Sequence, residues 1–397
     1  MKRTLVILIV VCLALAGIAA FGVLGADDDE VRRTVTPPTG AAAEHVSDTL
    51  GFYPGSPNGD GLQQFAEREQ WLGHPIAFFT AFGERSSLGG FNSNATGQFR
   101  DDRLGQWSAQ GEEPPFRLVY SLPLAFGPAY GGSDDVARLV EQQWDALLAG
   151  EAVGRRHPNA AGLSLDFYRD FARRLVDLGY EDAIIRLASE HDIQGAPWAS
   201  EIDYEKFKAT YRTVVDAMRA EAPQLTFDFT SILINFGDGS EPGPKVTNAY
   251  PGDEHVDYIG IDVYDQGEVA EALGVQPGDR CGWLEPEAVF ETYHEPVLET
   301  ARDYAEELGK PLSLPEWGLG GGGRGDGARQ VGQCGGDNPV FVERMHAFLA
   351  SLPARGPGSL GYHSYFEGNP TQDGPHALAE FPDAEAEFRI LFGRTNA

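Results

Sequence analysis

The sequence predicts an α/β fold, a single (β/α)₈ TIM barrel that follows an N-terminal segment and a linker. Two observations support this prediction. Eight short apolar runs recur along the chain, and stretches with apolar residues at i, i+3, i+4 and i+7 separate them. Strands that alternate with helices form a parallel sheet, and eight such units fit the roughly 200 to more than 400 residues that these barrels cover. The alternative is an open doubly wound sheet, but no Gly-x-Gly-x-x-Gly follows the first run and the chain contains no P-loop.

The apolar runs have the length of strands, and the stretches between them have the length of helices. We expect strands at residues 50–53, 76–82, 118–126, 183–188, 225–234, 256–264, 312–314 and 360–366. The expected helices include residues 136–148, 165–178, 204–220, 287–308 and 340–352. No further change of composition follows residue 48, so we expect one domain over residues 49–397.

The chain is strongly acidic. It has 30 Lys and Arg residues against 60 Asp and Glu residues, a formal net charge of −30. This balance argues against nucleic acid and against an anionic lipid surface as partners, because both bind basic patches. Charge of this size destabilises a compact protein unless salt screens it. We therefore expect a halophilic protein, with an ordinary acidic secreted protein as the alternative.

The N-terminus has the pattern of an export segment. Lys2 and Arg3 precede an apolar run over residues 5–25, and four acidic residues follow it. We expect residues 1–26 to be a signal peptide or, because the run is as long as the ~20 residues that span a bilayer, a retained membrane anchor. Residues 27–48 are acidic and then rich in Thr, Pro and Ala, which is typical of a linker. The protein is then secreted or anchored at the cell surface, outside the membrane.

Two cysteines follow the export segment, Cys281 and Cys334. In an oxidising compartment such a pair is more often bridged than free, so we expect a disulfide between them. Two cysteines without a nearby pair of histidines at ligand spacing do not make a tetrahedral zinc site.

Two glutamates end expected strands that face each other across the barrel mouth. Glu190 closes the fourth run and Glu316 closes the seventh, and the active residues of these barrels come from strand C-termini and the loops after them. Two carboxylates that face one cleft can divide the roles of acid and nucleophile at a glycosidic bond. Alternatively, each glutamate caps a following helix or pairs with an arginine. Trp198 and Trp317, which are near the glutamates in sequence, are candidate sugar contacts.

Aromatic residues also end the sixth and eighth runs. Tyr264 could donate a hydrogen bond to a nucleophilic carboxylate, or it could pack at the barrel rim. Tyr365 is one of several aromatic residues in the eighth run that could stack on the apolar face of a sugar ring. Asp262 and Asp265 could instead form a cation site, although their spacing alone is weak support for calcium.

With these residues the chain resembles glycoside hydrolase family 26. The acid/base strand of that family reads Arg-x-x-His/Trp-Glu-Met/Phe-Asn-Gly, and the family has Ser-Glu-Phe/Trp-Gly around the nucleophile. The corresponding segments here are Arg186-Leu187-Ala188-Ser189-Glu190-His191-Asp192-Ile193, then Ala196-Pro197-Trp198, and Pro315-Glu316-Trp317-Gly318.

The resemblance implies that Glu190 is the acid/base, that Glu316 is the nucleophile and that Tyr264 is the partner of Glu316. It places Arg186, Asp192 and Trp198 at the substrate site as well. Ser189 and Asp192 depart from the family pattern, so the identity of the sugar stays open.

The expected function is that of a retaining glycosidase that cleaves a polysaccharide of the β-mannan type. Glu316 attacks the anomeric carbon while Glu190 protonates the leaving oxygen, and Glu190 then activates water. This chemistry needs no metal or organic cofactor, and we expect the enzyme to act as a monomer. One alternative is a non-catalytic glycan-binding barrel of the cell envelope. Another is a metal-dependent hydrolase, but the nine histidines form no cluster in the sequence.

Overall fold

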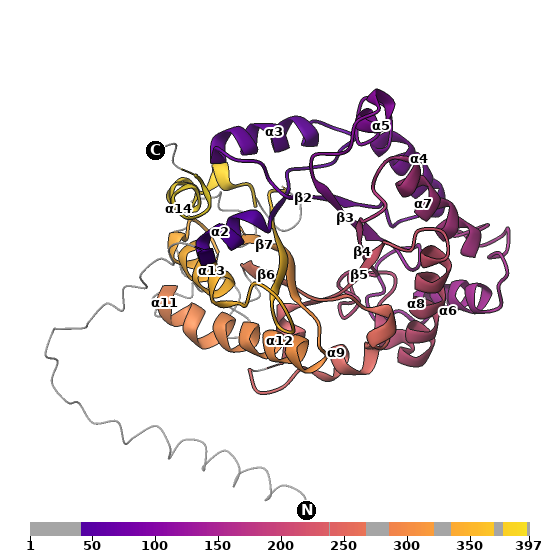
Figure 1. Cartoon of the computed structure of the whole chain (residues 1–397). Coiled ribbons are helices and arrows are strands. Elements are labelled where there is room, and N and C mark those ends of the chain that lie inside the picture. The colour runs from indigo at the N-terminus through magenta and orange to yellow at the C-terminus, as the bar shows by residue number, and fades with distance from the viewer. Residues whose placement is uncertain (1–40, 238, 267–285, 321–334, 369–375, 395–397) are drawn as a thin grey trace, which may run out of the picture. The chain divides into compact units, whose positions relative to one another are not determined.

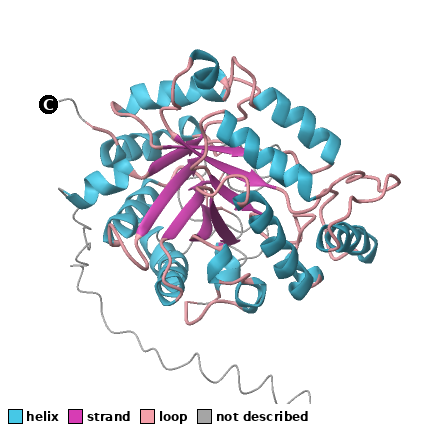
Figure 2. Ribbon diagram, turned by 45° about the vertical axis from the view of Figure 1, so that its right-hand side comes forward, coloured by secondary structure: helices cyan, strands magenta, loops and turns pink. Residues whose placement is uncertain are grey.

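The computed structural model describes residues 41–237, 239–266, 286–320, 335–368 and 376–394. It confirms the predicted barrel: eight parallel strands pair in chain order, and β1 and β8 close the ring. Figures 1 and 2 show helices around the strands on all sides. The strands are β1 Leu50–Tyr53, β2 Phe78–Phe82, β3 Arg117–Leu122, β4 Ile184–Leu187, β5 Thr226–Ile232, β6 Tyr258–Asp265, β7 Leu312–Leu319 and β8 Leu360–Phe366.

Each of the eight strands overlaps one of the apolar runs that predict it. The helices are α2 Ala41–Asp48, α3 Gly61–Leu72, α4 Leu88–Gln98, α5 Gln106–Gln110, α6 Asp134–Leu148, α7 Leu165–Asp177, α8 Tyr204–Arg219, α9 Pro244–Ala249, α11 Pro286–Val289, α12 Glu295–Glu307, α13 Pro339–Ser351 and α14 Pro382–Phe392. Several begin at a residue whose side chain accepts a hydrogen bond from a first-turn N–H: Ser87, Ser133, Asp203 and Asn338.

The barrel interior contains a buried polar layer beneath the mouth. Asp228 on β5 accepts hydrogen bonds from Ser313 on β7 (2.5 Å), Tyr362 on β8 (2.7 Å) and Thr230 (2.8 Å). A Cβ at Gly260 on β6 would lie 2.3 Å from an oxygen of Asp228, so glycine is needed there to leave room for the carboxyl group. These contacts show which residues of each strand face inward: residues 228 and 230 on β5, 260 on β6, 313 on β7 and 362 on β8.

The predicted linker is wrong over its last eight residues, which form helix α2. Helix α2 packs against α13 and α14, beside the C-terminal end of the chain (Figure 1). Val46 is fully buried there, and its carbonyl oxygen lies 2.9 Å from Nε2 of His363 on β8. Three alanines and an apolar contact surface favour a helix, although the prolines before it are typical of a linker.

Other predictions for the N-terminus and the cysteines fall outside the described residues. These are the export segment 1–26, the linker up to residue 40, and the disulfide between Cys281 and Cys334. None of the helices in the part of the chain that the structure describes is long and apolar enough to cross a membrane.

Candidate active site

Glu190 lies on a strained turn directly after β4. Ala188 and Glu190 both have left-handed backbone conformations, with φ of 54° and 51°. This region costs a residue with a Cβ about 1–2 kcal/mol, and such strain persists only where the surrounding structure enforces it. The Glu190 N–H donates to the carbonyl oxygen of Thr230 on β5 (3.1 Å), which ties the strained turn to the neighbouring strand.

The residues on either side of Glu190 are held by side chains from the next elements. Trp198 Nε1 donates to the carbonyl oxygen of Ser189 (3.0 Å). The His191 ring stacks on Phe229 with 4.3 Å between centroids, and its two nitrogens lie 3.1 and 3.0 Å from the hydroxyl oxygens of Ser200 and Ser231.

Asp192 completes this support. Its carboxylate accepts the N–H of Ile232 (3.2 Å), and its carbonyl oxygen accepts from Asn235 and from Lys245 (3.1 Å each). The turn that carries Glu190 is therefore attached to β5 and the segment after it at residues 190 to 192, and at Ser189 to Trp198 of its own loop.

Glu316 lies on β7 itself, at an irregularity in the pairing. Between Leu314 and Trp317, β7 contains one residue more than its partners: Gly260 and Val263 pair with Ser313 and Trp317, and His363 and Tyr365 pair with Leu314 and Trp317. Such a bulge redirects the side chains that follow it. Ser313 faces into the barrel, so strict alternation would point residues 315 and 317 inward; the bulge turns Glu316 inward instead.

Both oxygens of Glu316 accept hydrogen bonds. Arg186 Nη1 on β4 donates to Oε1 (2.5 Å), and the Tyr264 hydroxyl on β6 donates to Oε2 (2.9 Å). Arg186 is fully buried and also pairs through Nη2 with Asp262 (2.6 Å). Three strands thus fix the orientation of the Glu316 carboxylate.

The protonation of the site follows from burial and from these charges. Burial and the neighbouring Glu316 raise the pKa of the Glu190 carboxyl from 4.5 to about 8, so this group holds a proton at neutral pH. Burial and the same carboxylate raise the pKa of Tyr264 well above 10, so its hydroxyl remains a donor. A proton donor and a hydrogen-bonded carboxylate therefore face the same space.

That space is a cleft of about 760 Å³ at the barrel mouth. Glu190 and Glu316 both line it, together with Tyr264 and Trp198. Its other described aromatic side chains are Tyr53, Phe82, Tyr293, Phe366 and His376. Tyr53 packs against Phe82 and Phe366, with 4.7 and 4.9 Å between ring centroids. Aromatic faces beside a carboxyl pair are suited to hold sugar rings.

Two of the predicted sugar contacts are wrong. Trp317 is fully buried on the outside of the barrel, stacked on Phe388 of α14 with 5.8 Å between centroids. The bulge at Glu316 is the reason, because it turns the next residue outward. Tyr365 is also fully buried, and its ring packs edge-on against both Trp317 and Phe388.

Two further predicted substrate residues lie behind the cleft wall instead of lining it. Asp192 is buried, with an exposed fraction of 1%, and its carboxylate binds the Ile232 backbone. Arg186 is buried beneath Glu316. Both support the glutamates from behind.

Sequence reasoning missed several residues that line the cleft. Tyr53 and Phe82 end the first and second strands at positions that alternation places inward. Phe366 was among the aromatic residues of the eighth run that could stack on a sugar, and it lines the cleft in place of Tyr365. Tyr293 lies in a π-helical turn, η4 Phe290–His294, that interrupts the single helix expected over residues 287–308. Such turns carry an extra residue and are frequent at functional sites. Arg85 lies in the loop after β2, and no sequence motif indicated a role for it.

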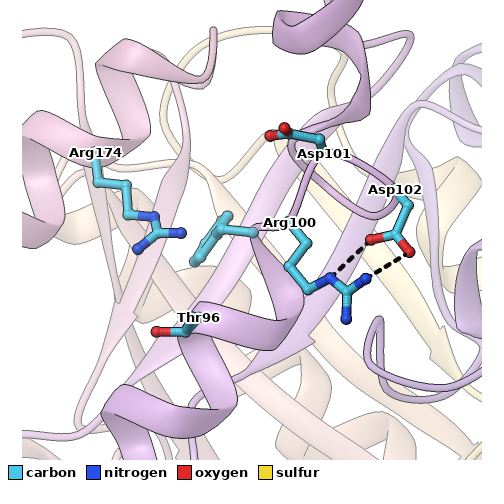
Figure 3. A pocket seen from close by; sticks show the side chains of 6 residues that line it. Thr96, Arg100, Asp101, Asp102 and Arg174 are labelled. Carbon is cyan, nitrogen blue, oxygen red and sulfur yellow. Dashed lines mark hydrogen bonds and ion pairs between the residues drawn. The ribbon is translucent and has the colours of Figure 1, made fainter.

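A second hollow lies away from the barrel mouth, between the end of α4 and helix α7 (Figure 3). Arg100 there pairs with Asp102 (3.0 Å), and the guanidinium of Arg174 lies 5.5 Å from the ring centroid of Phe99. It brings together no pair of carboxyl groups comparable to Glu190 and Glu316. Among the described residues, no group of three or more His, Cys, Asp or Glu side chains could hold a metal ion.

Comparisons with known proteins identify this architecture. No protein-family model and no curated protein sequence matches the chain. Solved structures do match. The catalytic domain of the GH26 endo-β-1,4-mannanase of Bacillus sp. JAMB-750 aligns with a TM-score of 0.54 and 16% identity over 89% of this chain and 90% of that chain. The chain therefore shares its fold with this GH26 structure.

Two further mannanases lead to the same conclusion. A ruminal GH26 endo-β-1,4-mannanase aligns with a TM-score of 0.51 and 16% identity over 93% of this chain and 70% of that chain. The modular endo-β-1,4-mannanase of Cellulomonas fimi aligns with a TM-score of 0.50 and 16% identity over 87% and 74%. The predicted resemblance is therefore confirmed for the fold, and identities this low do not establish the activity.

Proposed function

We propose that the protein is a retaining glycoside hydrolase that cleaves β-glycosidic bonds within a polysaccharide. One observation carries the proposal: a carboxyl group that holds its proton at neutral pH, Glu190, shares a cleft with a carboxylate fixed by two donors, Glu316. Two carboxyl groups in different protonation states serve glycoside hydrolysis by either course, and the two donors that orient Glu316 favour its direct attack, the retaining course.

In the first step an oxygen of Glu316 forms a bond to the anomeric carbon. The bond from that carbon to the leaving oxygen breaks, and the proton of Glu190 passes to that oxygen. Arg186 and Tyr264 hold the attacking carboxylate in line. The product is a glycosyl ester of Glu316, and the leaving sugar departs as an alcohol.

In the second step water attacks the same carbon from the side that the leaving group vacated. Glu190, now a carboxylate, takes a proton from this water, and the ester bond to Glu316 breaks. Formation of the ester removes the negative charge of Glu316, which is one cause of the raised pKa of Glu190. Glu190 can then act as a base.

β-Mannan is the first polymer to test, because the solved structures that align with this chain are named as endo-β-1,4-mannanases. We also propose that residues 1–26 export the protein and that Cys281 and Cys334 form a disulfide outside the cell. Mass spectrometry of the mature protein, with and without reduction, tests both points.

Hydrolysis is tested by release of reducing ends from β-mannan, glucomannan, β-1,3/1,4-glucan, xylan and arabinan. The assay is run at low and at multimolar salt, with Glu316→Ala as the control. We expect release from one polymer and its loss in the variant. Folded protein that binds a polymer and cleaves none of them would contradict the proposal and favour a glycan-binding barrel.

A further inference from the structure

Arg85 lies at the edge of the cleft on a loop with a fixed backbone. The loop joins β2 to α4, and three hydrogen bonds attach it to β3 and to the loops after β3 and α6. They run from Gly83 N–H to the Ser121 carbonyl oxygen (2.9 Å), from Gly127 N–H to the Arg85 carbonyl oxygen (3.1 Å) and from Asn159 Nδ2 to the Ser86 carbonyl oxygen (2.9 Å). The direction in which Arg85 leaves the main chain is therefore set before any ligand binds.

The Arg85 side chain, in contrast, has no partner among the described residues. It is exposed, and no carboxylate, carbonyl or aromatic ring of the described chain binds its guanidinium. The adjacent Glu84 forms no ion pair with it; the Glu84 carboxylate accepts the N–H of Ser86 (2.6 Å) and of Ser87 (3.4 Å) instead. Arg85 thus has no structural task that its contacts reveal.

Some exposed arginines of this acidic chain form ion pairs and others do not, and Arg85 differs from both groups in its place at the cleft. The exposed residues Arg100, Arg138 and Arg173 each form an ion pair. Arg155, Arg156 and Arg355 are exposed and form none among the described residues, but none of these three lines the cleft. Figure 3 shows one of these pairs, between Arg100 and Asp102.

None of the described acidic side chains that line the cleft forms an ion pair with Arg85. Arg85 is the only Lys or Arg among the described residues that line the cleft. Glu316 pairs with Arg186, and Glu190 is protonated at neutral pH. The charge of Arg85 reaches Glu190, where it opposes the effect of burial on the pKa. A group bound beside Glu190 is therefore within range of a free guanidinium.

We propose that Arg85 binds a negatively charged group on the sugar that lies next to Glu190, so that the substrate is an anionic β-glycan. A guanidinium offers two parallel N–H donors that match a carboxylate, a sulfate ester or a phosphate. The inference rests on the proposed hydrolase and narrows its substrate class to polymers that carry uronic acids or acidic esters.

The net charge of −30 opposes the approach of a polyanion, but this repulsion acts over longer distances than a contact with Arg85. At 1 M salt the Debye length is about 3 Å, so the field of distant carboxylates is screened while a direct contact with Arg85 persists. The preference for an anionic substrate is therefore measured at multimolar salt.

The test compares polymers with one backbone and different charge. For β-1,4-mannan these are polymannuronate, the neutral mannan obtained from it by carboxyl reduction, and the same mannan after sulfation. Arg85→Gln and Arg85→Lys are compared with the wild type. Arg355→Gln is the matched control, since Arg355 is also exposed and unpaired in the described chain and lies before β8, at the opposite end of the barrel.

We expect Arg85→Gln to lower kcat/KM on one anionic polymer about 10- to 100-fold, as for loss of a charged hydrogen bond, and to leave the neutral polymer nearly unchanged. Arg85→Lys should retain part of the preference, and Arg355→Gln all of it. The anionic polymer that responds identifies the group as a carboxylate or a sulfate. An equal loss on charged and neutral polymers would overturn the proposal.

A binding measurement separates this inference from hydrolysis. Calorimetry with Glu316→Gln and the matching oligosaccharides should give tighter binding of an anionic one, and the added Arg85→Gln change should abolish the difference. This result supports the inference even if no polymer is cleaved. Equal affinity for charged and neutral oligosaccharides, or no binding of either, would overturn it.

Discussion

The ends of β4 and β7 each present one glutamate to the cleft, but the two ends are built in opposite ways. At β4 the backbone is strained and held from behind, and in the described chain no hydrogen bond reaches the Glu190 carboxyl group. At β7 a bulge turns Glu316 inward, and Arg186 and Tyr264 bind both of its oxygens.

This difference explains how one residue type can serve two chemical roles. Without donors, and enclosed beside a negative charge, Glu190 keeps its proton and can give it away. With two donors, Glu316 keeps a fixed orientation and can attack. Backbone geometry directs both glutamates into the cleft, but donor side chains bind only the carboxylate of the second. The predictions below test that contrast.

Removal of the carboxyl groups should have the largest effect. We expect Glu316→Ala to lower kcat by roughly 10⁴-fold or more and Glu190→Ala by about 10²–10⁴-fold. An aryl glycoside with a good leaving group needs no acid, so it should restore the first step in Glu190→Ala only. With azide, Glu190→Ala should yield the β-glycosyl azide and Glu316→Ala the α-glycosyl azide. The reverse assignment of the two azides would exchange the roles of the glutamates.

Removal of one donor from Glu316 should have the next largest effect. Tyr264→Phe is expected to lower kcat about 10- to 100-fold, because it removes a hydrogen bond to a charged group, with little change in fold. Tyr180→Phe is a matched control: Tyr180 is also buried, and its hydroxyl donates to the Leu104 carbonyl oxygen (2.9 Å). Equal activity of the two variants would show that Tyr264 does not assist Glu316.

The pH profile tests the protonation of Glu190. The raised pKa means that the proton is present below pH 8 and is lost as the pH rises through that value. We therefore expect kcat/KM to fall with an apparent pKa near 8, by about tenfold for each further pH unit. An aryl substrate with a good leaving group should lack this basic limb. A basic limb with an apparent pKa of 4–5 would show that the protein does not raise the pKa of Glu190.

Relief of strain at β4 should have the smallest effect. Ala188→Gly removes the cost of a left-handed alanine and should stabilise the fold by about 0.5–1 kcal/mol, measured by denaturant unfolding. The same change at Ala209, inside helix α8, should destabilise it by about 1 kcal/mol. Destabilisation by both changes would mean that the β4 turn is not strained.

The strands and the two glutamates were predictable from the sequence because apolar runs and their polar ends are local patterns. The inward-facing aromatic residues were also within reach: Tyr362 and Phe366 share one face of β8, so Tyr365 must lie on the other. That alternation, applied once any inward residue is known, would have selected Phe366.

The orientation of β7 was not predictable in this way. One extra residue beside Pro315 reverses every side chain after it, so Trp317 next to a glutamate looked like a sugar contact and proved to be core. The roles of Asp192 and Arg85 were not predictable from the sequence either. Asp192 binds the backbone of Ile232, and Arg85 lacks a partner in the described chain. Both facts depend on how distant segments of the chain pack together.

The stereochemistry of the product tests the central claim most directly. Once a polymer is identified, proton NMR of the early reaction should show the new reducing end as the β-anomer, with the α-anomer appearing later by mutarotation. Two inversions at the anomeric carbon, through Glu316 and then water, predict this retention. Early appearance of the α-anomer would contradict the covalent step and the role assigned to Glu316.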